Sequence, residues 1–302
     1  MNGQGDRATP RALLATDGSI AARAAESWVT RARWAKAPEI EVLCMAPIVA
    51  GLAWALPPDH EEVRRALELL THDEEGVAQQ IAQEVVGRLR ETGLSATASV
   101  RSGQPAVGLL ERAADLRPTL VTMGSRGQTD REAMLLGSVT QQLTEHSMSP
   151  VLVARATGTP PGTIPQRLLI VAESSSTARA TVDWLSDQGW LRDARVTLLG
   201  LLGITPGLAA RAEPLAEEIA SEIRLWARDD LGELVDTIGR QAADVTLELQ
   251  FGHPLKLSLE LADALGVDLV AVARPPHQPG QYPFAELLAR YAARSVLLVP
   301  VT

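Results

Sequence analysis

Three glycines and a serine stand at a spacing that suits the binding of a phosphate group. Glycine lets backbone N–H groups approach a ligand without a Cβ in the way. A helix predicted from residue 137, with Ser138 close to its N-cap, would offer unpaired N–H groups and the positive end of its dipole to an anion. The same glycines could instead form only turns and a cap. The segment reads Met123, Gly124, Ser125, Arg126, Gly127, then nine residues, then Gly137, Ser138 and Val139.

A second polar turn, Asp17-Gly18-Ser19, directly follows the first predicted strand. Asp17 could accept hydrogen bonds from the hydroxyl or base groups of a ligand. Asp17 and Ser19 could also just cap the helix that begins near Ile20, and the two roles can coexist. The first and fourth strands would flank the reversal of strand order, where α/β sheets place their binding crevice.

Short apolar runs alternate with longer stretches of helical periodicity, which predicts βαβ crossovers and a parallel sheet covered on both faces. In the first half, strands are expected near 11–16, 40–45, 96–101, 119–123 and 150–154, and helices near 20–36, 60–92, 105–116 and 137–147. In the second half, strands are expected near 167–172, 195–201, 245–250, 268–273 and 295–299, and helices near 177–189, 211–241, 254–265 and 283–293.

The second half repeats the first by residue identity as well as by rhythm. At an offset of 156, Arg11 and Trp28 meet Arg167 and Trp184. At an offset of 149, identities run from Gly103 to Val121 against Gly252 to Val270. We therefore predict a duplicated α/β domain. The expected division is a disordered N-terminus at 1–10, a first domain at 11–155, a linker rich in Gly, Pro and Thr at 156–166, and a second domain at 167–302.

The first copy resembles the universal stress protein family. The resemblance covers residues 11–154 and rests on LLATDGS at 13–19, on the G-x2-G-x9-G-S spacing and on the final PVLV strand. It implies two tandem doubly wound five-stranded parallel sheets with the strand order 3-2-1-4-5, of the adenine nucleotide alpha hydrolase-like type. The second copy resembles the family more weakly.

The resemblance also implies that the first domain binds ATP, with Mg²⁺ or another divalent cation on the phosphates. Gly124, Gly127, Gly137 and Ser138 would hold the triphosphate, with Val139 adjoining and Arg126 beside it. Asp17 would contact the ribose or adenine, Ala15 and Met45 would line the adenosine pocket, and Met123 begins the signature. The family often has Pro at the position of Ala15 and His at that of Cys44; neither departure touches the phosphate cradle.

The second copy differs from the family's pattern at the positions that would hold the phosphates. Met123 to Gly127 face Val272-Ala273-Arg274-Pro275-Pro276, and Asp17 faces Glu173. Proline has no N–H to donate, and a side chain replaces each glycine. We therefore expect that the second domain does not bind ATP in the family's manner. It would serve as a degenerate copy kept for pairing, or else bind a different ligand or provide a regulatory surface.

Composition and charge exclude several other classes of protein. The formal net charge of −9 has the wrong sign for a protein that binds the phosphates of a nucleic acid. The chain has no run of 18 apolar residues and its first residues lack an apolar core, so we expect no membrane anchor or export signal. Cys44 is the only cysteine, which excludes intrachain disulfides and thiolate metal clusters and suits the cytoplasm. The five histidines lack metal-ligand spacing, so neither a catalytic nor a protein-held metal site is expected.

The resemblance to the family implies a regulatory or protective ATP-binding protein of the stress response. The expected partners are an adenine nucleotide, an unidentified regulatory protein, the second domain of the same chain and a second copy in a homodimer. One alternative is a slow ATPase or a phosphoryl- or nucleotidyl-transfer enzyme at the same site. No general base is evident near the γ-phosphate and no GxxxxGK[ST] motif occurs, so any ATPase activity should be weak. The other alternative is a scaffold without nucleotide.

Overall fold

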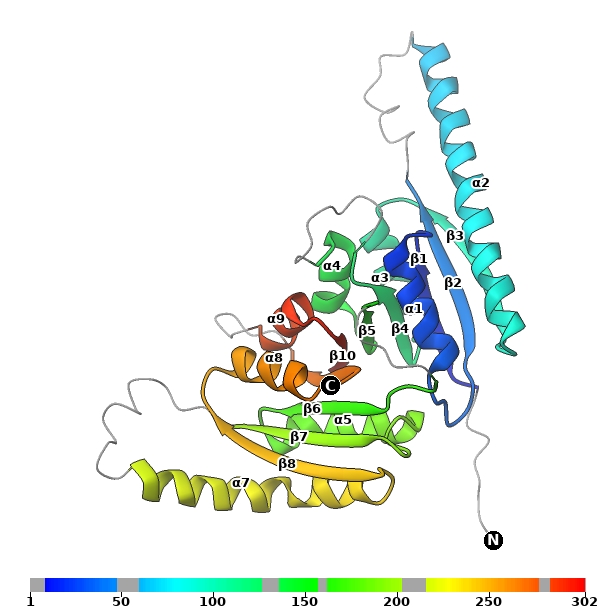
Figure 1. Ribbon diagram of the computed structural model, residues 1–302. Coiled ribbons are helices and arrows are strands. Elements are labelled where there is room, and N and C mark those ends of the chain that lie inside the picture. Colours follow the sequence, from blue (N-terminus) through cyan, green and yellow to red (C-terminus); the bar gives the residue numbers. More distant parts are fainter. Residues whose placement is uncertain are drawn as a thin grey trace. The chain divides into compact units, whose positions relative to one another are not determined.

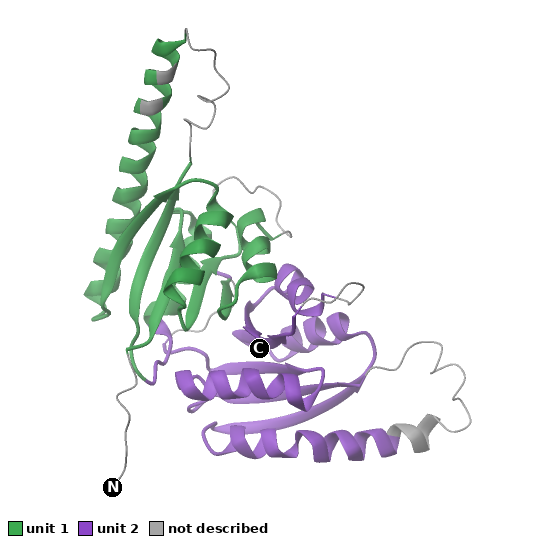
Figure 2. Ribbon diagram, turned by 180° about the vertical axis from the view of Figure 1, so that it is seen from behind, with its two compact units in different colours: residues 1–30, 36–154 green, residues 31–35, 155–302 purple. Residues whose placement is uncertain are grey.

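The computed structural model describes residues 9–47, 60–126, 136–156, 162–202, 216–276 and 283–301, without the side chains at 64, 68 and 216–220. The chain divides into two compact units (Figure 2). Unit 1 comprises residues 1–30 and 36–154, and unit 2 comprises residues 31–35 and 155–302. Residues 1–8 of the predicted N-terminal segment and 157–161 of the predicted linker lie outside the described residues.

Unit 1 is an α/β sandwich around a five-stranded parallel sheet (Figure 1). Its strands lie in the order β3-β2-β1-β4-β5, so the predicted fold is confirmed. The core strands β4 and β5 are buried at every residue, as expected for a sheet covered on both faces. The elements are β1 (Arg11–Thr16), α1 (Ile20–Arg31), β2 (Glu39–Ala46), α2 (Glu61–Glu91), β3 (Ala96–Ser102), α3 (Pro105–Leu116), β4 (Leu120–Gly124), α4 (Ser138–His146) and β5 (Val151–Ala154).

Unit 2 repeats this architecture with the parallel order β8-β7-β6-β9-β10, which corresponds strand for strand to unit 1. Trp184 packs edge-on against the fully buried Trp190, with 5.1 Å between ring centroids. Its counterpart Trp28 is buried in α1, so both tryptophans serve packing. The elements are β6 (Arg167–Ala172), α5 (Ser175–Gln188), β7 (Arg195–Leu202), α7 (Ala216–Gly239), β8 (Asp244–Phe251), α8 (Pro254–Ala264), β9 (Leu269–Arg274), α9 (Phe284–Tyr291) and β10 (Ser295–Pro300).

The helix predicted at 20–36 ends at Arg31, because the following backbone bonds to distant segments of unit 2. The carbonyl of Arg31 accepts a hydrogen bond from the N–H of Ile164, and the N–H of Arg33 donates to the carbonyl of Ile164. The N–H of Ala35 donates to the carbonyl of Gln188. These bonds satisfy groups that a longer helix would have paired internally, which periodicity alone could not reveal.

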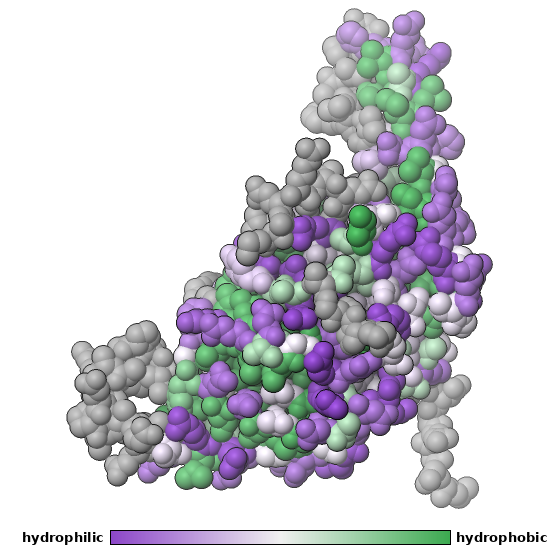
Figure 3. Space-filling model, viewed as in Figure 1, coloured by the Kyte–Doolittle hydropathy of each residue, from purple (hydrophilic) through white to green (hydrophobic). Residues whose placement is uncertain are grey.

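Helix α2 is the longest helix described and carries exposed apolar side chains as well as charges. Val63, Leu69, Leu70 and Val77 are exposed on it, and hydrophobic surface is visible along this helix in Figure 3. Its C-terminal half packs more deeply: Val85, Val86 and Leu89 are buried beside β2 and β3. The apolar stripe therefore continues past the part of the helix that packs on the sheet.

A bidentate ion pair between Arg112 of α3 and Glu41 of β2 contributes to the stability of unit 1. The guanidinium donates to both carboxylate oxygens, at 2.8 and 2.6 Å. Burial is the largest single influence and would raise the pKa of Glu41, but the hydrogen bonds and charge of Arg112, together with Ser99 and Arg101, outweigh it and the pKa is lowered. The pair therefore stabilises the fold above the ordinary carboxyl pKa of 4.5, and this contribution is lost as the pH falls through the lowered pKa.

Replacing Arg112 by Met should lower the free energy of unfolding by about 1–2 kcal/mol at neutral pH, because a partly buried carboxylate loses its partner. The difference from wild type should shrink as the pH falls below 4.5. Urea denaturation across this pH range measures it. Arg65→Met, which removes an exposed i,i+4 pair with Glu61, should change little and is the matched control. A pH-independent loss for Arg112→Met would contradict the assignment.

Candidate functional site

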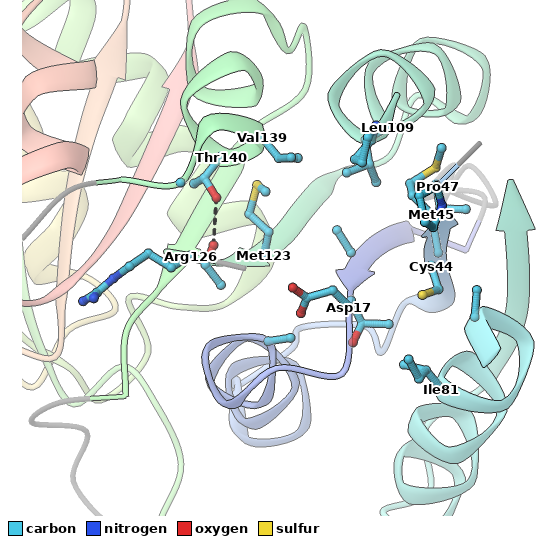
Figure 4. A pocket seen from close by; sticks show the side chains of 18 of the residues that line it. Asp17, Cys44, Met45, Pro47, Ile81, Leu109, Met123, Arg126, Val139 and Thr140 are labelled. Carbon is cyan, nitrogen blue, oxygen red and sulfur yellow. Dashed lines mark hydrogen bonds between the residues drawn. The ribbon is translucent and has the colours of Figure 1, made fainter. Parts of the chain in front are cut away.

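A cavity of about 380 Å³ opens at the carboxyl edge of the sheet of unit 1 (Figure 4). Its size lies in the usual range for small-molecule sites. It is formed where β1, β2 and β4 end, between α2, α3 and the start of α4. The structure brings nine of the ten predicted site residues together around it, and Gly127 lies outside the described residues. The nine are Ala15, Asp17, Met45, Met123, Gly124, Arg126, Gly137, Ser138 and Val139.

The turn after β1 positions Asp17 at the cavity. Gly18 has φ +75°, a left-handed conformation that glycine adopts without strain. One carboxylate oxygen of Asp17 accepts a hydrogen bond from the N–H of Ser19 at 3.0 Å. The Ser19 hydroxyl in turn accepts from the N–H of Ala22 at 3.1 Å and caps α1. Asp17 therefore fixes the turn while lining the cavity, so the two roles considered for it are geometrically compatible.

The end of β4 and the start of α4 are joined by two hydrogen bonds. The N–H of Gly137 donates to the carbonyl of Ser125 at 3.0 Å, and the Thr140 hydroxyl donates to the carbonyl of Gly124 at 3.0 Å (Figure 4). Gly137, with an extended backbone, is the N-cap, and Ser138 is the first helical residue. These bonds hold the N-terminus of α4 at the wall of the cavity.

Backbone N–H groups in the first turn of α4 remain available as hydrogen-bond donors as far as the described residues go. No side chain caps it, and among the described residues no acceptor is recorded for the backbone N–H groups of Ser138, Val139 and Thr140. The Ser138 residue is exposed. Unpaired N–H donors at the positive end of a helix dipole suit an anionic group.

Gly124 has a packing reason to be glycine. A Cβ at this position would lie 2.5 Å from the backbone carbonyl carbon and oxygen of Ala21 in α1. The close approach of α1 to the end of β4 therefore explains this glycine without any ligand. Its predicted role in holding phosphate stays a prediction, although the residue also lines the cavity.

Helices α2 and α3 contribute an apolar wall that was not predicted from the sequence. Val77, Ala78 and Ile81 recur at helical spacing on the face of α2 that lines the cavity, together with Glu74. Helical periodicity could have identified this face. From α3, Pro105 and Leu109 complete the wall.

Three side chains that line the cavity, Cys44, Asp17 and Arg126, differ in what they present to it. Burial raises the pKa of the Cys44 thiol to about 11, and the nearby Asp17 carboxylate adds to the shift, so the thiol is protonated at neutral pH. Figure 4 shows the Asp17 carboxylate directed into the cavity, whereas the guanidinium of Arg126 extends away from it. Arg126 lines the cavity, but its guanidinium does not converge with the other labelled side chains in this view.

The cavity combines a hydrogen-bond acceptor, an apolar wall and an anion-binding helix end. Asp17 can accept from hydroxyl or amino groups, the side chains of α2 and α3 can cover a flat ring, and the first turn of α4 can receive a phosphate. Over the described ranges, no three His, Cys, Asp or Glu side chains cluster in a way that could hold a metal ion. The described helices also include none that is long and apolar enough to cross a membrane.

Comparison of the sequence with known protein families gives a match over residues 9–155. These residues match the family model described as "Universal stress protein family". A curated relative, universal stress protein YxiE of Bacillus subtilis (strain 168), is 28% identical over 153 residues, which cover 47% of this chain and 97% of the relative. Both matches correspond in length to one unit.

Structural comparison extends the likeness to both units. A universal stress protein from Archaeoglobus fulgidus DSM 4304 aligns with a TM-score of 0.64 at 16% identity, over 96% of this chain and 98% of the other. A functionally unknown protein from Pseudomonas aeruginosa PAO1 aligns with a TM-score of 0.59 at 13% identity, over 97% of this chain and 93% of the other. At these identities the alignments establish a shared fold.

Proposed function

The chain belongs to the universal stress protein family through residues 9–155, and from this premise we propose that unit 1 binds ATP. Family membership supports a role in the stress response. The observation that carries the nucleotide proposal is the convergence of Asp17, the apolar wall and the start of α4 on one cavity. We further propose that nucleotide occupancy alters how the protein meets a regulatory partner or a second copy.

The adenosine half of the ligand would lie among the ends of β1 and β2 and the wall from α2 and α3. Met45, Ile81 and Leu109 offer apolar contacts to the base. Asp17 offers its carboxylate to ribose hydroxyls or to an amino group of the base. Because Asp17 also accepts from the Ser19 N–H, its orientation is set before a ligand arrives.

The phosphates would lie at the first turn of α4. Backbone N–H groups of Ser138 and Val139 can donate to phosphate oxygens, and the Ser138 hydroxyl can add a further hydrogen bond. A divalent cation would fit as a partner of the phosphates and water, since the described residues offer no cluster of three metal-binding side chains. Such a cation would neutralise phosphate charge in the carboxylate-containing cavity.

We assign ATP binding to unit 1 alone. At the corresponding end of β9, unit 2 has Arg274 followed by Pro275 and Pro276 in place of the glycine-containing turn. The first turn of α9 carries Glu286, a carboxylate at the helix end where unit 1 would place phosphate. A carboxylate there satisfies the helix dipole and repels a phosphate.

Equilibrium dialysis of the full chain against ATP with Mg²⁺ tests the proposal, and about one equivalent of ATP per chain is expected. Asp17→Asn should weaken ATP and adenosine alike, by about tenfold, because a charge-assisted hydrogen bond is lost. The Asn amide oxygen can still accept from the Ser19 N–H, so the turn should survive. Absence of saturable ATP binding by the wild type would sink the proposal.

Product analysis after the same dialysis separates a binding protein from the enzyme alternative. ATP recovered intact after hours at stoichiometric protein indicates binding without turnover. Steady release of ADP that Asp17→Asn leaves unchanged would place hydrolysis at another site.

A further inference from the structure

Unit 2 has a cavity of its own, of about 280 Å³, between the carboxyl ends of β6 and β7 and the helix α7. It corresponds to the β1, β2 and α2 part of the unit 1 cavity, because Glu173 occupies the place of Asp17 in the repeat. Among the described residues, nothing from β9 or α9 lines it. The lining therefore omits the half of the site at which unit 1 offers its helix N-terminus.

Carboxylates supply the charge of this cavity. Glu173 and Asp230 line it. Within the described residues Glu173 has no recorded hydrogen-bond donor or ion-pair partner, whereas Asp230 accepts a hydrogen bond from the Ser175 hydroxyl at 2.8 Å. Although Glu173 is exposed as a residue, burial of its carboxyl raises its pKa, and the nearby Glu286 carboxylate adds to the shift. In the part of the chain that the structure describes, no cation compensates this carboxyl.

Aromatic side chains complete the cavity. Trp226 of α7 lines it while remaining 66% exposed. Phe251 lies at the end of β8, and the guanidinium of Arg224 stands 5.1 Å from its ring centroid. Aromatic faces attract cations, and carboxylates attract them further. The apolar ring of a ligand can pack against the exposed indole of a tryptophan at a cavity.

We propose that unit 2 binds a small organic ammonium ion with an apolar ring, its cationic group at Glu173 and Asp230 and its ring against Trp226. A phosphorylated ligand is disfavoured because the carboxylates repel anions and only accept hydrogen bonds when ionised. This ligand class differs in charge from the nucleotide proposed for unit 1. The inference does not depend on that nucleotide.

Tryptamine and indole-3-acetate test the proposal, because they share an indole ring and carry opposite charges. In equilibrium dialysis with the full chain, tryptamine should bind saturably, and indole-3-acetate should bind at least tenfold more weakly. Glu173→Gln and Trp226→Ala should each weaken tryptamine by about tenfold, through loss of a charge-assisted hydrogen bond and of the aromatic surface respectively. Both residues are exposed, so both variants should fold, which circular dichroism checks.

Matched controls locate the site. Leu225→Ala removes a neighbouring side chain that is 65% exposed on α7 and does not line the cavity, and it should leave tryptamine affinity unchanged. Asp17→Asn should also leave it unchanged, which separates this site from unit 1. Equal affinity for the two probes, unaltered binding by Glu173→Gln, or loss of tryptamine binding in Asp17→Asn would overturn the proposal.

Discussion

Replacing Ser138 by Asp is expected to weaken ATP binding roughly a hundredfold and to leave adenosine binding nearly unchanged. The new carboxylate would stand at the first residue of α4, where the phosphates are proposed to lie. Like charges about 4 Å apart repel by ~4 kcal/mol at the effective dielectric of a protein surface, before screening by the cation. Because an acidic residue favours a helix N-terminus, the fold should be retained or slightly stabilised. Parallel dialysis against ATP and adenosine measures the difference.

Gln142→Glu is the control for the charge itself. Gln142 is exposed on the same helix and does not line the cavity. The substitution Gln142→Glu should therefore reduce ATP affinity only slightly. If Ser138→Asp weakened adenosine as strongly as ATP, or if both variants weakened ATP equally, the placement of the phosphates at α4 would be wrong.

Replacing Gly124 by Ala should cost about 3 kcal/mol of stability, the upper end of the usual effect of forcing atoms into a filled core. The added Cβ would lie 2.5 Å from backbone atoms of Ala21, which cannot move away as a flexible side chain could. Either α1 or the end of β4 must shift. Urea denaturation should therefore show a large decrease in the midpoint of the transition that reports on unit 1.

Gly87→Ala is the opposite case at a second glycine of unit 1. Gly87 lies inside α2 and a Cβ there would meet nothing within 4 Å. Alanine has the higher helix propensity, so this variant should gain about 0.5–1 kcal/mol. Equal effects from the two substitutions would contradict the packing explanation for Gly124.

The fold could be predicted from the sequence because its strands are short, apolar and separated by helical stretches. β1 and β6, at Arg11–Thr16 and Arg167–Ala172, have the predicted bounds, and each depends on local pattern alone. Helix ends were harder to predict. The end of α1 at Arg31 is set by hydrogen bonds to Ile164, more than 100 residues away, and no local pattern encodes such a partner.

The candidate site shows the same division between local and distant causes. The residues at strand ends and at the start of α4 could be predicted because the topology of a parallel sheet brings its carboxyl ends to one edge. The wall from α2 could not be predicted in the same way. The acidic sequence around Glu74 indicates an exposed helix, yet Val77 and Ile81 of the same helix share one face and line the cavity. The packing role of Gly124 could not be predicted, since a glycine does not reveal which neighbour excludes its Cβ.

The short segment 31–35 limits how this protein can be divided. The chain leaves unit 1 after α1, joins unit 2 for five residues through Ala32 and Ile164, and returns to form β2. A fragment cut after residue 154 would keep Trp34 but lose Trp190, whose ring centroid lies 5.5 Å away. A fragment that begins at residue 155 would therefore lack residues 31–35, which belong to unit 2, and with them the ring contact of Trp34 to Trp190.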